Sequence, residues 1–574
     1  MDPEKGPRAK SSSHSDPKLE SDDDLVSKGI SGIRYLVGLQ LFSRLITFVM
    51  NQLVLRSISP STLGIVEIQL ELLLSTILFL SREGFRVALL RLKATESVAS
   101  DTKSHITQKT ENRGSTESQQ HKTLALPEQE VFNISIVPVL IGIPLTLAVS
   151  TGYYLNQLWY NPDQDQPPLF GLTITLYGLA ATLELISEPL YILSQNRMLF
   201  KLRAQSEGLA IFGRCLTTLI GVKIGDMISS GESNTLALVS FALARLTFSI
   251  ALIATYLVYY INAEGGWTIF KQKFQLRKID RTSQSYYFEP SIFRLSISFI
   301  KQSFLKHILT EGDKIVMPWV CSRDEQGIYA AAINYGSLPA RILFQPLEES
   351  CRVTLPKLLA QSSENTKQDP TKKEKGMDVP RRLLAVCFKL HILFGSTIIV
   401  FGTQYSEILI SVLLGKSWST RLGPALAAYC YYIPIMGING IMESYVSAII
   451  TKDEVSTMNK MMILFSAIYL SAAVVLSGNY FSGVSGWLAA NSLNMILRIS
   501  WCYRLMRRFF ASNGSTFPPL AEILPTKVVS ILFVIISIAL QWIDGFFQNS
   551  ESLIDKLTRL VPGAIFFVIL MAAM

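Results

Sequence analysis

The stretch LQLFSRLITFVMNQLVLRSI, residues 39–58, is long and apolar enough to cross a membrane as a helix, yet it carries a polar stripe. If each residue advances about 100° around the helix axis, four polar side chains fall within about 60° of one another: Gln40, Arg44, Thr47 and Asn51. An arginine in hydrocarbon costs at least ~2.5 kcal/mol. The pattern therefore predicts that this stripe faces other polar groups or water, and not lipid.

Similar stripes recur along the chain. Further polar residues gather on one helical face in five more apolar stretches: Glu67, Glu71, Ser75, Arg82 and Arg86; Glu184 and Glu188; His307, Thr310, Glu311 and Lys314; Asn334, Arg341, Gln345, Glu348 and Arg352; and Asn439 and Glu443. Several helices that each bury charge are stable in a membrane only if the stripes face each other or line water. The sequence therefore predicts a polar chamber enclosed by membrane helices.

The composition supports a polytopic membrane protein. Hydrophobic residues make up 49% of the 574, and charged residues only 17%, against about 25% in ordinary soluble domains. Apolar runs recur along the chain, and each has the ~20 residues that a bilayer core requires. We predict fourteen spans, near 30–56, 61–90, 131–158, 169–195, 201–227, 234–262, 291–319, 325–355, 382–414, 421–451, 456–478, 481–510, 520–544 and 554–574.

The distribution of Lys and Arg predicts the orientation. One set of alternate loops between these spans holds 26 cations and the other holds five. Cytosolic loops carry the excess of Lys and Arg in membrane proteins. Both termini and the long loops are therefore expected in the cytosol, and the net charge of +9 needs no nucleic acid to explain it.

Weak internal similarity indicates a duplication. The segment SISPSTLGIVEIQLELLLS aligns with VCSRDEQGIYAAAINYGSL at an offset of 263, Glu188 with Glu443 at 255, and Arg245 with Arg498 at 253. These matches predict an all-α chain of two parallel six-helix lobes followed by two helices. The expected organisation is a disordered cytosolic N-terminus (1–27), an N-lobe (28–262, with a disordered cytosolic loop at 92–127), a cytosolic linker (263–290), a C-lobe (291–510, with a cytosolic loop at 361–380) and the last two helices (511–574).

The charges on the stripes have three possible roles. Guanidinium groups bind phosphate oxygens in bidentate fashion, so the arginines favour an anionic head group. Ion pairing within the membrane is the second reading, with Glu83 against Arg86 and Glu348 against Arg352 as examples. Coupling to a cation or proton is the third, with five candidate carboxylates: Glu184, Glu188, Glu311, Asp313 and Glu443.

Enzymatic and metal chemistry find little support in the sequence. There is no GxxxxGK[ST] nucleotide-binding loop. The predicted spans contain only two histidines, His307 and His391, too few for a metal centre. The acidic triplet DQD at 163–165 is best read as a solvated turn. We therefore expect no catalytic residue, cofactor or metal.

Five strings resemble the eukaryotic Rft oligosaccharide-translocation family, whose superfamily also contains bacterial lipid II flippases and toxin-extrusion antiporters. They are LFSRLITFVMNQLVLRSISPSTLGI, LFLSREGFRVALL, SFLKHILTEGDKIVMPW, QGIYAAAINYGSLPARILFQPLEESCR and NGIMESYVSAIITKDEV. The resemblance implies fourteen helices in two lobes plus two. It also implies an endoplasmic-reticulum membrane protein of the N-glycosylation pathway, whose substrate is dolichol pyrophosphate carrying a mannose-rich oligosaccharide.

The resemblance and the stripes together define the predicted site. The family's intramembrane arginines correspond to Arg44, Arg56, Arg82, Arg86 and Arg498, and its acidic cavity residue to Glu311. The stripes add Arg341, Lys314 and His307 as candidate substrate-binding residues. They also add Glu184, Glu188 and Glu443 as candidate cavity or coupling carboxylates.

The expected function is that of a monomeric flippase working by alternating access, with possible H⁺ or Na⁺ coupling. Two alternatives remain open at this point. One is a non-transporting accessory or scaffold protein of the same pathway, because one fold can serve both roles. The other is an ion-coupled small-molecule exporter, which should have a more acidic and aromatic lining.

Overall fold

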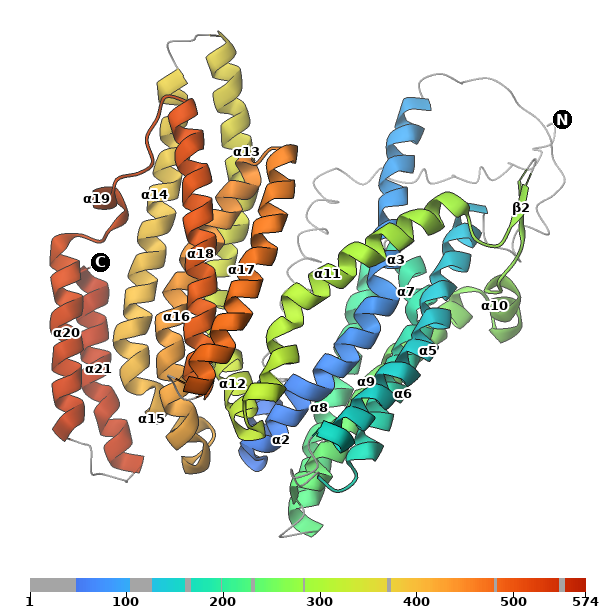
Figure 1. Ribbon diagram of the computed structural model, residues 1–574, viewed down its shortest axis with the longest axis horizontal. Helices are drawn as coiled ribbons and strands as arrows, with labels where there is room; N and C mark the ends of the chain where they lie inside the picture. Colours follow the sequence, from blue (N-terminus) through green and yellow to red (C-terminus); the bar gives the residue numbers. More distant parts are fainter. Residues whose placement is uncertain are drawn as a thin grey trace, which may run out of the picture. The chain divides into compact units, whose positions relative to one another are not determined.

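The computed structural model shows an almost entirely helical protein with one short two-stranded hairpin (Figure 1). It describes residues 48–103, 126–160, 167–197, 199–228, 233–281, 284–368, 373–479, 483–546 and 553–573. Two features of the sequence lie outside the described residues: Arg44, with most of the first predicted span, and the DQD triplet. The described residues are predominantly helical, as predicted, and the short hairpin is the exception.

The first half of the described chain begins with residues 51–57, which are helical, and continues through seven helices and one π-helical turn. These are α2 (Pro60–Gly64), the π-helix η1 (Ile65–Leu70), α3 (Glu71–Lys103), α5 (Leu126–Tyr160), α6 (Phe170–Ile186), α7 (Glu188–Asn196), α8 (Phe200–Ile228) and α9 (Ser233–Ala263).

The second half begins after the hairpin and ends with two helices that pack on each other. It contains α11 (Pro290–Val320), α12 (Arg323–Gly336), η2 (Ala340–Phe344), α13 (Gln345–Gln368), α14 (Lys373–Thr397), η4 (Ile398–Gly402), α15 (Thr403–Leu413), α16 (Lys416–Ile449), α17 (Lys452–Asn479), α18 (Gly483–Ser512), α19 (Leu520–Ile523), α20 (Lys527–Phe546) and α21 (Leu553–Ala573).

Eight stretches of the described chain are helical, long and apolar enough to cross a membrane. They are Pro60–Leu89, Glu128–Leu158, Phe170–Asn196, Phe200–Ile228, Asn234–Ala263, Met377–Leu413, Lys416–Ile449 and Glu454–Gly478. The predicted spans at 291–319, 325–355 and 481–510 are also helical but more polar, and α20 and α21 have shorter apolar stretches. The structure therefore supports a polytopic helical membrane protein, and leaves the count of fourteen spans a prediction.

Two predicted loops are shorter than expected. Helix α3 continues to Lys103 and α13 to Gln368, so the beginnings of the loops at 92–127 and 361–380 are helical. Both extensions are polar, but they contain residues with good helix propensity such as Ala, Leu, Lys and Glu. Hydropathy marks where a chain leaves the membrane and not where its helix ends, which explains the difference.

The two halves contain matching pairs of packed helices. Helix α8 packs on α9 as α17 packs on α18, α6 contacts α9 as α16 contacts α18, and α3 contacts α5 as α13 contacts α14. The helices α2 and α12 also begin alike. Ser59 caps α2 by accepting the N–H of Thr62, and Ser322 caps α12 by accepting the N–H of Glu325. These serines are the pair that the offset of 263 aligns.

The halves meet where α3 packs on α11 and where α2 crosses α12. A Cβ atom added at Gly327 would lie 1.8 Å from the carbonyl oxygen of Pro60, and one added at Gly64 would lie 2.2 Å from that of Arg323. Gly64 and Gly327 are again an aligned pair in the repeat. Only glycine allows two backbones to approach this closely. Beside the crossing, the indole N–H of Trp418 donates to the backbone oxygen of Ile58 at 3.2 Å.

The predicted linker is folded against the N-half. It contains α10 (Trp267–Lys273) and an antiparallel hairpin of β1 (Ile279–Arg281) and β2 (Gln284–Tyr286). The amide of Asn133, on α5, donates at 2.7 Å to the backbone oxygens of Arg277 and Tyr287, and its side chain is fully buried. Asn133 therefore fastens the linker to α5.

We expect Asn133→Ala to destabilise the protein by about 2–4 kcal/mol, because two backbone carbonyls lose their donor at ~1–3 kcal/mol each. Thermal unfolding of the purified protein in detergent measures the effect. Gln272→Ala is the matched control, because the Gln272 side chain is exposed on the same linker. Equal melting temperatures for Asn133→Ala and Gln272→Ala would show that the linker does not depend on this contact.

Candidate functional site

A cavity of about 370 Å³ lies between helices of both halves. Residues 51–55, η1, α3, α6, α8 and α9 line it from the first half, and α11 and α12 from the second. Its polar lining consists of Asn51, Glu67, Glu71, Tyr177, Arg214, Thr218, Arg245, Lys314 and Asn334. A polar chamber among apolar helices is what the stripes predicted, and its lining can now be assigned residue by residue.

The π-helical turn η1 provides the acidic side of the cavity. In η1 the N–H of Glu71 bonds to the carbonyl of Val66, five residues back, so the helix is wider here than an α-helix. Glu67 and Glu71 both line the cavity, and neither forms an ion pair or hydrogen bond within the described chain. Such turns are frequent at functional sites. Arg214, Arg245 and Lys314 lie near enough to Glu67 to attract it without forming a direct contact, so its oxygens can still accept hydrogen bonds from a ligand.

Three cations lie on the other elements. Lys314 of α11 pairs with Glu311 at 2.7 Å, and Arg245 of α9 pairs with Glu184 at 3.3 Å. Arg214 of α8 lines the cavity, and the described residues offer its guanidinium no ion pair or hydrogen bond. Because an unpaired arginine is costly inside a membrane, Arg214 is the strongest candidate anion-binding residue in the cavity.

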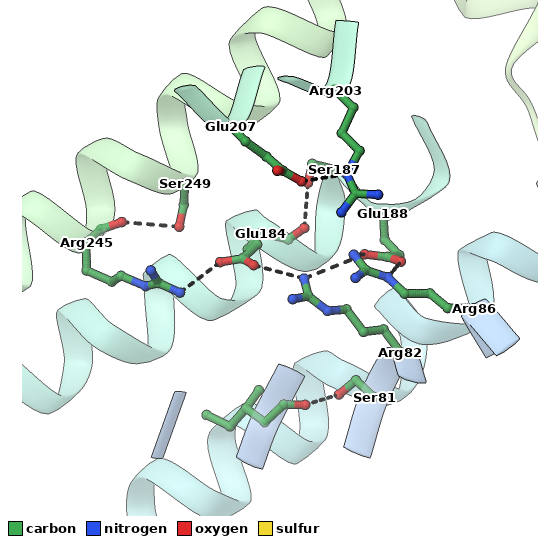
Figure 2. Close-up of polar contacts among 11 residues, drawn as sticks. Ser81, Arg82, Arg86, Glu184, Ser187, Glu188, Arg203, Glu207, Arg245 and Ser249 are labelled. Carbon is green, nitrogen blue, oxygen red and sulfur yellow. Dashed lines mark hydrogen bonds and ion pairs between the residues drawn. The ribbon is translucent and has the colours of Figure 1, made fainter. Parts of the chain in front are cut away.

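An ion-pair network connects α3, α6, α7 and α9 beside the cavity (Figure 2). Glu184 lies between two arginines, 2.9 Å from Arg82 and 3.3 Å from Arg245. Arg86 holds both carboxylate oxygens of Glu188, in the bidentate geometry that Arg favours. The structure thus brings four predicted site residues, Arg82, Arg86, Glu184 and Glu188, into contact with one another.

The network favours the ion-pairing interpretation for these four residues. The carboxylate partner of Arg86 is Glu188 on another helix, and not Glu83 one turn away, which lies 3.9 Å from Lys306. Glu184 and Glu188 are at most 7% exposed, and a buried charge needs a partner. Of the paired arginines, Arg245 lines the cavity and Arg82 and Arg86 do not, while Arg214 lines it without an ion pair to a described residue.

The second half contains a similar pair, one helical turn away, because the repeat aligns Glu443 with Glu188 and not with Glu184. Arg498 of α18 forms an ion pair with Glu443 of α16, as Arg245 of α9 does with Glu184 of α6. Arg245 and Arg498 are the residues that the repeat aligned. The aligned arginines therefore bind carboxylates on corresponding helices.

The other predicted residues lie away from the cavity lining. Arg341 is exposed and donates to Ser337 at 2.5 Å within its own helical segment, and Arg56 is exposed. His307 is 4% exposed, with Nε2 2.9 Å from Thr76 Oγ1 and its ring stacked on Phe79. Of the predicted substrate-binding residues that the structure describes, Lys314 is the one that lines the cavity.

The sequence analysis missed Arg214 and Tyr177. Arg214 is four residues before Thr218, which also lines the cavity, and this spacing was the available signal. Tyr177 lies on α6, seven residues before Glu184 and therefore on the same helical face, and this spacing was the available signal. Within the described part of the chain, no group of three or more His, Cys, Asp or Glu side chains is arranged to hold a metal ion.

Comparisons with known proteins agree with this architecture. The family model described as Rft protein matches residues 28–574. The chain is 31% identical to the Man(5)GlcNAc(2)-PP-dolichol translocation protein RFT1 of Kluyveromyces lactis, over 92% of this chain and 93% of the relative. It is 32% identical to the protein of the same name from Mus musculus, over 87% and 85%.

The fold also has a counterpart among solved structures. It is similar to lipid II flippase MurJ in an inward closed conformation, with a TM-score of 0.54 and 14% sequence identity. The similarity covers 94% of this chain and 98% of the other. The same fold thus occurs in a protein described as a lipid II flippase.

Proposed function

The chain belongs to the Rft protein family, and from this premise we propose that it moves a dolichol-pyrophosphate-linked, mannose-rich oligosaccharide across the endoplasmic-reticulum membrane. The direction is from the cytosolic to the lumenal leaflet, in support of protein N-glycosylation. The relatives that align over most of their length are named as translocation proteins for Man(5)GlcNAc(2)-PP-dolichol. The same cargo accounts for the polar cavity of this chain.

The single observation that carries the proposal is a cavity whose Arg214 has no described protein partner and which apolar helices surround. A pyrophosphate and its sugars cannot cross ~30 Å of hydrocarbon unaided, because each buried unpaired polar group costs ~2–7 kcal/mol. The cations and hydrogen-bonding groups that line a cavity replace the hydrogen bonds that the pyrophosphate and sugars make with water. The polyisoprenoid tail needs no such shelter and stays in the lipid.

We assign the phosphate-binding role to Arg214, with Lys314 and Arg245 beside it. Arg245 pairs with Glu184 at 3.3 Å and Lys314 with Glu311 at 2.7 Å, so these carboxylates partly neutralise both cations. Arg214 is free to donate two parallel hydrogen bonds to phosphate oxygens.

The mechanism we propose is alternating access between two lobes of six helices, with fourteen spans in all and both termini in the cytosol. The matching helix pairs of the two halves and the glycine crossing of α2 on α12 support it. On the predicted topology this crossing lies at the lumenal ends of the helices. The protein would act as a monomer, and a carboxylate such as Glu311 would take part if transport is coupled to H⁺ or Na⁺.

Reconstitution tests the proposal directly. Purified protein in vesicles that contain the glycolipid should speed its appearance on the opposite leaflet relative to empty vesicles. Arg214→Ala should reduce that rate about tenfold to a hundredfold, because a hydrogen bond to a charged group is worth ~1.5–3 kcal/mol.

Arg203→Ala is the matched control for Arg214→Ala. Arg203 lies on the same helix and pairs with Glu207 at 2.8 Å, on an exposed face. Its loss should leave the transport rate unchanged. No acceleration by the wild-type protein would contradict translocation and favour the accessory role.

A further inference from the structure

The mixed charge of the cavity is not explained by a pyrophosphate alone. Glu67 and Glu71 line the same cavity as Arg214, and an anionic ligand would be repelled by both carboxylates. The cations of the cavity partly balance these two charges, but the described residues donate no side-chain hydrogen bond to either carboxylate. The two carboxylates therefore indicate a ligand with hydrogen-bond donors as well as negative charge.

Tyr177 gives an independent indication of the same kind. Its side chain is 1% exposed and lines the cavity, and the described residues offer its hydroxyl no hydrogen bond. A tyrosine hydroxyl that lines a cavity can donate a hydrogen bond to a ligand there. The amides of Asn51 and Asn334 also line the cavity.

Sugar hydroxyls meet the needs of these groups. A hydroxyl donates to a carboxylate in a short, charge-assisted bond about twice as strong as a neutral one. It also accepts from a tyrosine hydroxyl or an amide. A ligand with phosphates at one end and hydroxyls at the other would satisfy both the cationic and the acidic side.

The size of the cavity limits how much of the sugar chain it encloses. Its volume of about 370 Å³ is near the lower end of the ~300–1,000 Å³ of pockets for drug-sized ligands. A chain of five mannoses and two N-acetylglucosamines is several times larger than such a ligand. The cavity therefore has room for the pyrophosphate and the sugar attached to it, and the distal sugars must lie outside.

We propose that the cavity recognises the stem of the glycolipid, meaning the pyrophosphate and its first N-acetylglucosamine, and does not read the number of mannoses. This inference rests on the proposed function. Arg214 binds the phosphate, and Glu67, Glu71 and Tyr177 bind hydroxyls of the first sugar. Lipid-linked chains with fewer mannoses are then substrates for the same cavity.

Binding to the full-length protein in detergent tests this with three short-chain prenyl pyrophosphate probes: one without sugar, one with two N-acetylglucosamines, and one with the same stem and five mannoses. The two sugar-bearing probes should bind within about threefold of each other, since they differ only outside the cavity. Both should bind about tenfold or more tightly than the sugar-free probe.

Two variants distinguish binding of the phosphate end of the ligand from binding of its sugar end. Glu67→Gln should weaken both sugar-bearing probes about tenfold and leave the sugar-free probe unchanged or tighter, because it removes a repulsive charge. Arg214→Ala should weaken all three probes. Glu83→Gln is the matched control on helix α3, because Glu83 does not line the cavity.

Three outcomes would overturn the inference. The first is that the five-mannose probe binds more than tenfold tighter than the mannose-free one. The second is that Glu67→Gln weakens the sugar-free probe as much as the others. The third is that EDTA abolishes binding of the wild type, which would place a divalent cation between the carboxylates and the pyrophosphate.

Failure of the proposed function looks different. In that case a cooperatively unfolding wild-type protein would bind none of the three probes and would not speed transport. Each of the outcomes above keeps binding and transport when no chelator is present and changes only what the cavity recognises.

Discussion

Gly327→Ala is expected to abolish the support of N-glycosylation while the protein remains in the membrane. The new Cβ would lie 1.8 Å from the carbonyl oxygen of Pro60, and backbone on both sides prevents a cheap adjustment. Gly64→Ala should have the same effect, since its Cβ would lie 2.2 Å from the oxygen of Arg323. Helices α2 and α12 could then not cross as they do here, and the state closed at this crossing would be lost.

The measurement is glycosylation of a reporter in cells that lack any other copy of the protein. Gly208→Ala is the matched control, because an added Cβ at this helical position of α8 meets no atom within 4 Å. Alanine is favoured over glycine by about 1 kcal/mol inside a helix, so this variant should be neutral or slightly stabilised. Normal glycosylation in Gly327→Ala cells would mean that closure of this crossing is not part of the transport cycle.

A second readout separates a failed cycle from failed folding. Purified Gly327→Ala protein that melts cooperatively near the wild-type temperature, yet does not transport, has lost the closed state only. If the variant does not accumulate, the crossing is needed for folding, and Gly64→Ala tests whether the other side of the contact behaves alike.

The sequence predicted which faces of the helices are polar but not which helices those faces meet. The stripe with Arg82 and Arg86 is real, and so is the pair Glu184 and Glu188. Periodicity orders residues around one helix axis, and it contains no information about the neighbouring helix. The sequence therefore indicated that ion pairs form within the membrane, but it could not show that α3 pairs with the α6–α7 segment.

Arg214 shows the opposite limit. On its helix, Arg203, Glu207, Arg214 and Thr218 fall within about 60° of one another, but this stripe was not among those from which the site was predicted. Its importance comes from facing the same cavity as Glu67 and Lys314, which lie far away in the sequence. The π-helical turn that carries Glu67 was also beyond prediction, because nothing in IVEIQL distinguishes it from an α-helix.

The weak internal repeat turned out to be the most useful long-range signal. It aligned Gly64 with Gly327 and Arg245 with Arg498 before any contact was known. In the structure the two glycines touch, and both arginines pair with glutamates on corresponding helices. Equivalent residues of two repeats lie close to each other when both are near the axis that relates the repeats. This explains why the aligned glycines are in contact.

Glu184→Ala is expected to be the most destabilising single change in the first half. Glu184 is the common partner of Arg82 and Arg245, whose side chains are 18% and 12% exposed. Removing one member of a buried ion pair costs about 3–5 kcal/mol, because the remaining charge is left without compensation. Here Arg245 loses its ion-pair partner and Arg82 keeps only the longer contact to Glu188 at 3.7 Å. The loss is a large part of the ~5–15 kcal/mol by which proteins are stable.

Abundance in cells and thermal unfolding in detergent measure the effect of Glu184→Ala, with Glu207→Ala as the matched control. Glu207 pairs with Arg203 at 2.8 Å, but both side chains are about 40% exposed (41% and 43%), and exposed pairs contribute only ~0.2–1 kcal/mol. The double variant Glu184→Ala, Arg245→Met should recover part of the loss, since it removes one uncompensated charge. The contrary outcome is a Glu184→Ala protein that accumulates and melts normally but does not transport. Arg82 and Arg245 would then be ligand-binding residues, and not only partners of a structural ion pair.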